Sequence, residues 1–366
     1  MRRSSVDMGE PQAVTFSPYP MRGGIVGRIA GELNTGGHPL WPLASAFFMS
    51  SRVLQTAVRL GVFTALAEGP SDAPSLARAC RASTEGLEAL LTACVALGLL
   101  ERSSSGLYRN SLLVSRMLLP GRPDYYGDVI EGLSAVYEHW VQLERSVRSG
   151  RATVPPTHRG RGESLRAYLS YVHRSSQQQA PLLADAVDLS NCRLLLDIGG
   201  GLGTYSIELC RRWPRLEAVV LELPAVVPLA REMIAGQGLS RRIAVQAGDY
   251  RSQAFGASND VVLFANVLQH EPLQVRRILL SKALKSLSPG GRVLVHDAML
   301  NAEKSGPLPV ALGGLNLLLH SGGGSYSISE LEQWLTEAGF LKPRVEMQTE
   351  SGLALGIAEA PGQSDR

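Results

Sequence analysis

The chain has 366 residues, of which 45% are hydrophobic and 19% are charged, and its formal net charge is +3 at pH 7. This length allows two domains with well-buried cores, and the composition is typical of a globular protein. The small net charge argues against nucleic acid as a partner. No apolar run is long enough to span a membrane, and no signal peptide is visible, so we expect a cytoplasmic protein without a membrane partner.

The first third of the chain predicts an extension followed by a small helical domain. Residues 1–38 are rich in Gly, Pro, Ser and Arg without periodicity, which is typical of a flexible extension. Residues 39–120 predict three helices and a hairpin, the pattern of a winged helix. These elements begin near Trp41, Asp72, Ser83 and Leu99. The third helix carries Thr and Glu but no Lys or Arg, so we favour a dimerisation role over DNA binding.

The middle of the chain, residues 121–190, predicts a helical linker, which we expect to line a ligand pocket. Its Tyr168 and Tyr171 either line a ligand cavity or pack in the core. His139, His158 and His173 have no partners at metal-ligand spacing, and no acidic cluster suits a divalent cation, so no metal is expected. The chain's four cysteines are expected to be buried and reduced, because each lies in an apolar pattern and no CxxC spacing occurs.

Residues 191–360 alternate between apolar strand patterns and helical patterns, which predicts a mostly parallel, Rossmann-like α/β sheet. The predicted strands are 194–198, 218–223, 243–247, 261–265 and 292–297. The predicted helices cover about 204–213, 225–237, 273–287, 310–320 and 329–338. A tight turn is expected at 288–291, and a hairpin of 343–347 and 354–358 ends the region.

The first of these strands ends in Leu196-Asp197-Ile198-Gly199-Gly200-Gly201-Leu202-Gly203. Glycines there let the backbone turn sharply and approach a ligand such as NAD, another nucleotide or adenosylmethionine. Glu222, at the end of the second strand, can accept both hydroxyls of a ribose. Asp249 and Tyr250 follow the third strand and can meet an adenine. An acid ahead of the glycines, at Asp197, can take the amino group of an amino-acid tail, which favours adenosylmethionine over NAD.

Several blocks of the chain together resemble one enzyme family. These blocks are Leu196–Gly203, Leu221-Glu222-Leu223-Pro224-Ala225-Val226, Gly248-Asp249-Tyr250, Ser288-Pro289-Gly290-Gly291-Arg292 and Glu337-Ala338-Gly339-Phe340. They are similar to the signature blocks of the S-adenosylmethionine-dependent small-molecule O-methyltransferases, which include the caffeate, hydroxyindole and polyketide enzymes. The similarity covers about residues 40–360. It implies a class I methyltransferase domain after a winged-helix dimerisation domain, a homodimer, S-adenosylmethionine as cofactor and a small-molecule acceptor.

The resemblance also implies roles for the matched cofactor residues. Asp197, Gly199 and Gly201 would hold the methionine part of the cofactor, Glu222 the ribose, and Asp249 and Tyr250 the adenine. The rest of the predicted cofactor-binding set is Gly200, Leu223, Gly248 and Asn266.

The predicted catalytic set is His270, Gln269 and Asp297, and it departs from the family's pattern. Many members carry His-Asp-Trp after the fourth strand, with the His as general base. Alignment on Val267-Leu268 puts Gln269 at the base position, whereas a slip of one residue restores His270. A histidine titrates near neutrality, as a base requires, and an amide does not. The alternative is a loop histidine that caps the next helix.

The supporting acids of the family are only partly present. Asp297 matches the acid that follows the fifth strand, whereas Gly323-Gly324-Ser325-Tyr326 lacks the second acid. Alignment of acceptor and methyl group can by itself supply ~7–11 kcal/mol. Asn316 and His320 are candidates for the acceptor pocket.

The predicted function is transfer of a methyl group from S-adenosylmethionine to a hydroxyl, with a phenol favoured, on a small aromatic or polyketide-like metabolite. The N-terminal domain would complete the partner subunit's substrate pocket. Gln269 and Ser325 leave open a C- or N-methyltransferase. A winged-helix regulator that senses a nucleotide-like ligand is the alternative from another class of protein.

Overall fold

The computed structural model describes residues 44, 46–122, 124–155 and 162–362. The predicted extension at 1–38 and His158 lie outside the described residues. The chain divides after Ser134 into two compact units, and this division falls within helix α7 (Gly127–Trp140). The predicted boundaries near residues 120 and 190 therefore stay predictions. Among the described helices, none combines the length and apolar character that crossing a membrane requires.

The first unit has the mostly helical order that the sequence predicts, with an antiparallel hairpin after its fourth helix. Its elements are α2 (Phe47–Arg59), α3 (Val62–Ala65), α4 (Ala73–Ala79), α5 (Thr84–Ala96), β1 (Leu100–Arg102), β2 (Tyr108–Asn110) and α6 (Leu112–Met117). Side-chain caps start α4, α5 and α6, where Asp72, Ser83 and Ser111 accept backbone N–H groups. The first helix is shorter than expected, because Gly61 at φ +70° separates α2 from α3.

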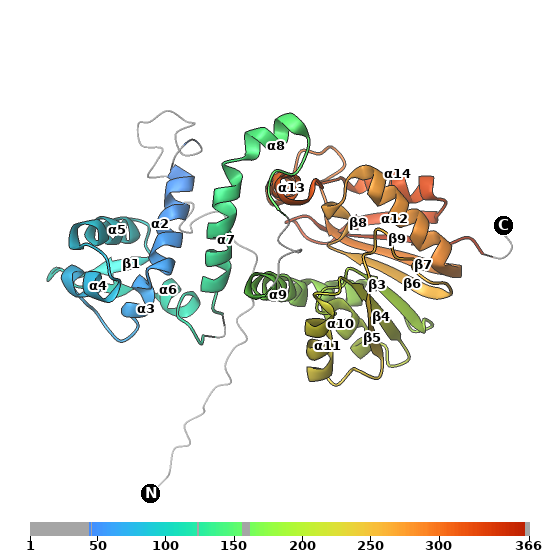
Figure 1. The fold of residues 1–366 in the computed structure, drawn as a ribbon, viewed down its shortest axis with the longest axis horizontal. Helices are drawn as coiled ribbons and strands as arrows, with labels where there is room; N and C mark the ends of the chain where they lie inside the picture. The colour runs from blue at the N-terminus through green and yellow to red at the C-terminus, as the bar shows by residue number, and fades with distance from the viewer. Residues whose placement is uncertain (1–43, 45, 123, 156–161, 363–366) are drawn as a thin grey trace, which may run out of the picture. The chain divides into compact units, whose positions relative to one another are not determined.

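The second unit contains a seven-stranded sheet of order β5-β4-β3-β6-β7-β9-β8 (Figure 1). Its strands are β3 (Leu194–Ile198), β4 (Glu217–Glu222), β5 (Ile243–Ala247), β6 (Asn259–Ala265), β7 (Leu287–Ala298), β8 (Leu341–Met347) and β9 (Leu353–Glu359). Strands β3 to β7 are parallel, whereas β9 lies antiparallel between β7 and β8. The turn expected at 288–291 is instead part of β7, opposite a shift in the register of β6.

Helices cover both faces of this sheet (Figure 1). One face packs on α12 (Leu273–Ser286) and α14 (Ile328–Ala338) through a core that includes Phe264, Leu280 and Trp334. The other packs on α9 (Glu163–Ala186), α10 (Thr204–Arg212) and α11 (Val227–Gly236). The described residues of the second unit also form α8 (Leu143–Ser149), η3 (Leu268–His270) and α13 (Leu308–Ser321). All four cysteines are buried and free, as predicted.

Candidate active site

A pocket lies at the carboxyl ends of β3, β4, β5 and β6, the edge of a parallel sheet at which ligands bind. Its lining includes the predicted cofactor residues Gly199, Gly201, Glu222, Leu223, Asp249, Tyr250 and Asn266. Helix α9 adds Tyr168, whose pKa is raised to about 12 by burial. Tyr171, which was predicted beside Tyr168, is 51% exposed.

Asp197 lies beneath the glycine turn and not on the pocket lining. It is fully buried, and its Oδ2 accepts a hydrogen bond of 2.7 Å from the Ser206 hydroxyl. Its Oδ1 has no hydrogen-bond partner among the described residues. Burial raises the pKa of Asp197 to about 6. A Cβ on Gly200 would lie 2.5 Å from Oδ2, so this position needs glycine for the carboxylate to fit.

Glu222 closes the turn from the neighbouring strand. Its Oε2 accepts the Gly201 N–H at 3.0 Å, and its Oε1 accepts the Leu223 N–H at 2.7 Å. Burial raises the pKa of this carboxyl group, which nevertheless keeps two backbone donors. Gly248 lies behind the lining, with space for a Cβ limited by Leu221 at 3.0 Å. These contacts hold a carboxylate at the end of β4, where the sequence predicts the ribose.

The segment after β6 places His270 on the pocket lining. Gln269 is half-buried, and its amide nitrogen lies 3.4 Å from Asn266 Oδ1. Asn266 itself adopts φ +56° and donates to Gln179 Oε1 at 2.9 Å. The sequence left open whether Gln269 or His270 occupies the position of the base. Of these two residues, His270 lines the pocket.

Asp297 is fully buried at the end of β7, where its Oδ2 accepts the Tyr326 hydroxyl at 2.5 Å and the Gln269 N–H at 3.3 Å. Burial raises the pKa of Asp297 to about 6. These contacts place the carboxylate against the backbone of η3. It would therefore act on the conformation of the His270 segment.

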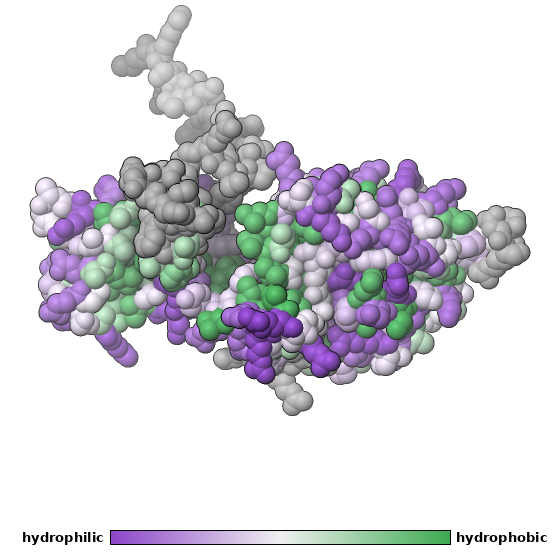
Figure 2. All heavy atoms as spheres, turned by 90° about the horizontal axis from the view of Figure 1, so that it is seen from above, coloured by the Kyte–Doolittle hydropathy of each residue, from purple (hydrophilic) through white to green (hydrophobic). Residues whose placement is uncertain are grey.

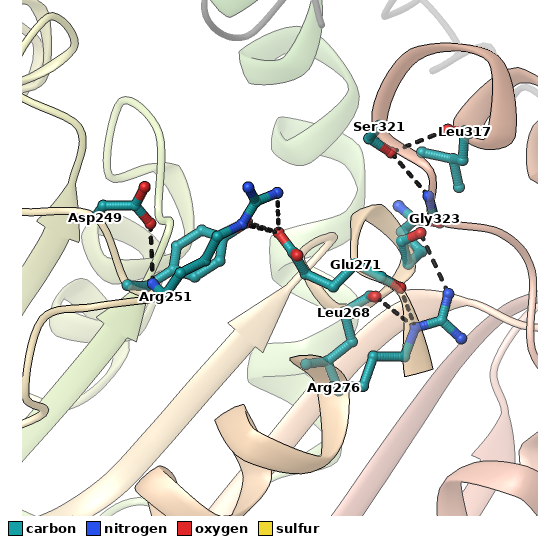
Figure 3. A network of polar contacts seen from close by, with 10 residues as sticks. Asp249, Arg251, Leu268, Glu271, Arg276, Leu317, Ser321 and Gly323 are labelled. Carbon is teal, nitrogen blue, oxygen red and sulfur yellow. Dashed lines mark hydrogen bonds and ion pairs between the residues drawn. The ribbon is translucent and has the colours of Figure 1, made fainter. Parts of the chain in front are cut away.

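The site also contains two charged residues, Glu271 and Arg276, that were not among the predicted site residues. Glu271 is fully buried, and its Oε1 accepts the Tyr250 hydroxyl at 2.7 Å and the Arg251 guanidinium at 2.9 Å. Arg276, which is 5% exposed, donates to backbone carbonyls on both sides of Gln269. Figure 3 shows how these side chains join the Asp249 loop to η3 and to the Gly323 loop. A charged residue within an otherwise apolar helical face, as at Arg276, was the available signal.

Polar side chains from segments far apart in the sequence also form hydrogen bonds behind the pocket and elsewhere in the second unit. Tyr205, behind the glycine turn, has its hydroxyl 2.9 Å from His296 Nδ1 and 3.1 Å from Gln179 Oε1. His296 is completely buried, as expected for a core position, and burial lowers its pKa to about 4. Farther along the second unit, His139 Nδ1 lies 2.8 Å from His320 Nε2. Within the described ranges, no group of three or more His, Cys, Asp or Glu side chains could hold a metal ion.

Fold and pocket together define a class I methyltransferase preceded by a helical unit. Two family models match, an O-methyltransferase dimerisation domain at residues 41–121 and an O-methyltransferase domain at residues 157–341. The chain belongs to the S-adenosylmethionine-dependent O-methyltransferase family, and S-adenosylmethionine is its cofactor.

Curated relatives and solved structures agree with this assignment. The 3-hydroxy-5-methyl-1-naphthoate 3-O-methyltransferase of Streptomyces sahachiroi is 35% identical and matches 79% of this chain and 85% of its own length. The L-tyrosine C(3)-methyltransferase of Streptomyces lavendulae is 31% identical over 85% of this chain and 90% of that protein. The structure of human N-acetylserotonin methyltransferase with S-adenosylmethionine is 28% identical, with a TM-score of 0.76, and covers 90% of this chain and 99% of that one.

Proposed function

We propose that this enzyme methylates a phenolic hydroxyl of a small aromatic or polyketide-like metabolite, with His270 as the general base. The observation that carries this proposal is the position of His270 on the wall of the pocket that Gly199, Glu222 and Asp249 also line. A base must reach the acceptor proton beside the methyl donor, and in the described part of the pocket His270 supplies an imidazole at that wall. The naphthoate enzyme, with its hydroxylated aromatic acceptor, supports the phenolic assignment.

The proposed cofactor residues fit S-adenosylmethionine in charge and shape. The space beside Gly201 is open for the methionine part, and the lack of a Cβ at Gly200 lets Asp197 pack beneath the turn. Asp197 keeps one oxygen without a partner among the described residues. Glu222 would bind the ribose hydroxyls, and Asp249 with Tyr250 would bind the adenine. When bound, the cofactor supplies a methyl group on a positively charged sulfur. The chain's part is to align the acceptor oxygen, exclude water and hold the acceptor's proton at a ring nitrogen of His270.

We also propose a cytoplasmic homodimer formed through the winged-helix domain at 39–120, with the extension at 1–38 and the pocket-lining linker at 121–190 preceding the methyltransferase domain at 191–360. The match to a dimerisation domain supports this assembly. In the first unit, α2 and α6 expose apolar side chains, with Met49 at 51% and Leu112 at 85%. Figure 2 shows apolar residues gathered in patches on the face in view.

The four free, buried cysteines fit the reducing compartment that the proposed cytoplasmic location implies.

The base assignment is tested by comparing His270→Ala with the adjacent variant Gln269→Ala. Each is assayed for S-adenosylhomocysteine formation with a panel of hydroxynaphthoates. We expect His270→Ala to lose at least about a hundredfold in kcat, which is the contribution of a positioned base. Gln269→Ala should change kcat less than about fivefold, because the side-chain contact of Gln269 is a long one at 3.4 Å. A His270→Ala enzyme within threefold of wild type would refute the assignment.

A second candidate function is methylation at carbon, supported by the similarity to the tyrosine C(3)-methyltransferase and by Gln269 at the aligned base position. The two functions differ in the atom that receives the methyl group. NMR of the product made with a CD3-labelled cofactor distinguishes them, because an O–CD3 carbon resonates far from a C–CD3 carbon. The phenol panel is therefore run beside tyrosine and an aromatic amine.

A further inference from the structure

Arg276 lies at the start of α12 and is buried. It is a charged residue whose neighbours on that helix include the core residues Leu279 and Leu280. Its Nε donates to the carbonyls of Leu268 at 2.8 Å and Glu271 at 2.7 Å. One terminal nitrogen donates to Gly324 O at 2.5 Å and lies 3.4 Å from Gln269 O. The guanidinium thus binds carbonyls at both ends of η3 and on the facing Gly323 loop (Figure 3).

The same guanidinium packs on two aromatic rings, at 4.8 Å from the Tyr326 centroid and 5.4 Å from the Trp334 centroid. Tyr326 donates its hydroxyl to Asp297, and Asp297 accepts the N–H of Gln269. The carbonyl of Gln269 in turn accepts the N–H of Gly324 at 2.9 Å. Both polar groups of the Gln269 backbone are therefore held within this cluster of buried side chains and loop backbone.

His270 follows directly and has a second fixed neighbour. Glu271 is anchored through its carboxylate to Tyr250 and Arg251, and through its carbonyl to Arg276. The histidine on the pocket wall is thus held between two residues whose backbones Arg276 contacts. A buried charge is costly unless its hydrogen bonds are satisfied, and an apolar side chain would pack on the core of α12 at lower cost. The guanidinium at this position donates hydrogen bonds to the carbonyls of the turn, which an apolar side chain cannot do.

We propose that Arg276 is a positioning residue for methyl transfer, which holds the Leu268–Glu271 turn so that the His270 side chain faces the pocket. The inference rests on the proposed role of His270 as base. Arg276 lies behind η3 and would act through the turn. Lysine cannot replace it, because an ammonium is a compact group and cannot span carbonyls at both ends of η3 and on a second loop.

The test is Arg276→Lys, with Arg277→Lys as the matched control. Arg277 is the next residue along α12, but its guanidinium pairs with Glu337 at the surface. We expect Arg276→Lys to lower kcat by about 10- to 100-fold, the cost of a misplaced catalytic group, with the KM of the hydroxynaphthoate and the Kd of S-adenosylmethionine within threefold of wild type. Arg277→Lys should leave all three unchanged. A kcat of Arg276→Lys equal to that of the control overturns the proposal.

The double variant Arg276→Lys/His270→Ala distinguishes failure of the Arg276 proposal from failure of the proposed base. If Arg276 acts through His270, Arg276→Lys should change the residual rate of His270→Ala by less than about twofold. Suppose that His270→Ala is strongly impaired and that Arg276→Lys lowers kcat by the same factor in wild type and in His270→Ala. This result overturns the proposed role of Arg276 and leaves His270 as the base. A silent His270→Ala refutes the base. Should Arg276→Lys not fold, Tyr326→Phe keeps the ring under the guanidinium and removes its hydrogen bond to Asp297. It should lower kcat in wild type and leave the rate of His270→Ala unchanged, and additivity there also overturns the proposal.

Discussion

The buried carboxyl group of Asp297 makes the stability of the protein depend on pH in an unusual direction. Its pKa rises from 3.8 to about 6 because burial disfavours the charged form. The folded protein therefore binds this proton more tightly than the unfolded chain does. The resulting stabilisation is fully present below pH 3.8 and is lost as the pH rises to about 6. At about 1.36 kcal/mol per pKa unit, the loss is about 3 kcal/mol.

Asp297→Asn isolates this contribution, since asparagine is neutral at every pH and its carbonyl can still accept the Tyr326 hydroxyl. We expect the free energy of unfolding of the variant, relative to wild type, to rise by about 2.5 kcal/mol between pH 4 and pH 8, because about 0.5 kcal/mol of the loss has already occurred at pH 4. The amide NH2 would occupy the place of the unpartnered Oδ1 and lower the stability of the variant equally at each pH. The change with pH, and not the absolute difference, is thus diagnostic.

Urea unfolding of the cofactor-free protein at constant ionic strength measures this difference. Asp188→Asn is the control, because Asp188 is an exposed carboxyl whose pKa is lowered by the Ser190 N–H. Its effect has the opposite sign and falls mostly below pH 4. Parallel stability curves for wild type and Asp297→Asn between pH 4 and pH 8 would contradict the reasoning, and so would a relative loss of variant stability as the pH rises.

Two further predictions concern the cofactor pocket. Gly200→Ala should weaken S-adenosylmethionine binding at least tenfold by calorimetry, because its Cβ would lie 2.5 Å from Asp197 Oδ2, whereas Gly236→Ala, with open space around it, should bind normally. Equal affinity of the two variants would show that the turn tolerates a side chain. Glu222→Ala should raise the Kd by about 10- to 100-fold, the value of hydrogen bonds to a charged group, and the exposed Glu232→Ala should not. An unchanged Kd for Glu222→Ala would remove the ribose assignment.

Local patterns predicted the second unit closely. The strand at 194–198 has the bounds expected from its apolar run, because Asp197 and the glycines after it mark its end. The pocket residues followed from their positions at strand ends, since parallel strands bring their carboxyl ends to one edge. The break of the first helix at Gly61 was missed, because a single glycine within a continuous apolar face does not show that it adopts φ +70°.

The polar network behind the pocket could not be found in the same way. Gln179 meets Asn266 across 87 positions of the chain, and Arg276 meets Gly324 across 48. A charged residue in a loop, such as Glu271, has the pattern of a surface position until its partners are known, and the apolar helical face around Arg276 does not show which groups the guanidinium contacts. The choice between Gln269 and His270 likewise depends on which side of a three-residue turn faces the pocket, and that is a property of the backbone.

The position of β9 between β7 and β8 affects the order in which the sheet can form during synthesis. The ribosome must add roughly 60 further residues after β7 before β9 is complete, which takes about 3–12 s at usual rates. Throughout that interval the apolar strand β7 can pair with β6 but has an open edge on its other side. An open edge of this kind can pair with another chain. Nascent chains of this protein are therefore exposed to misassembly at this edge until β9 is complete.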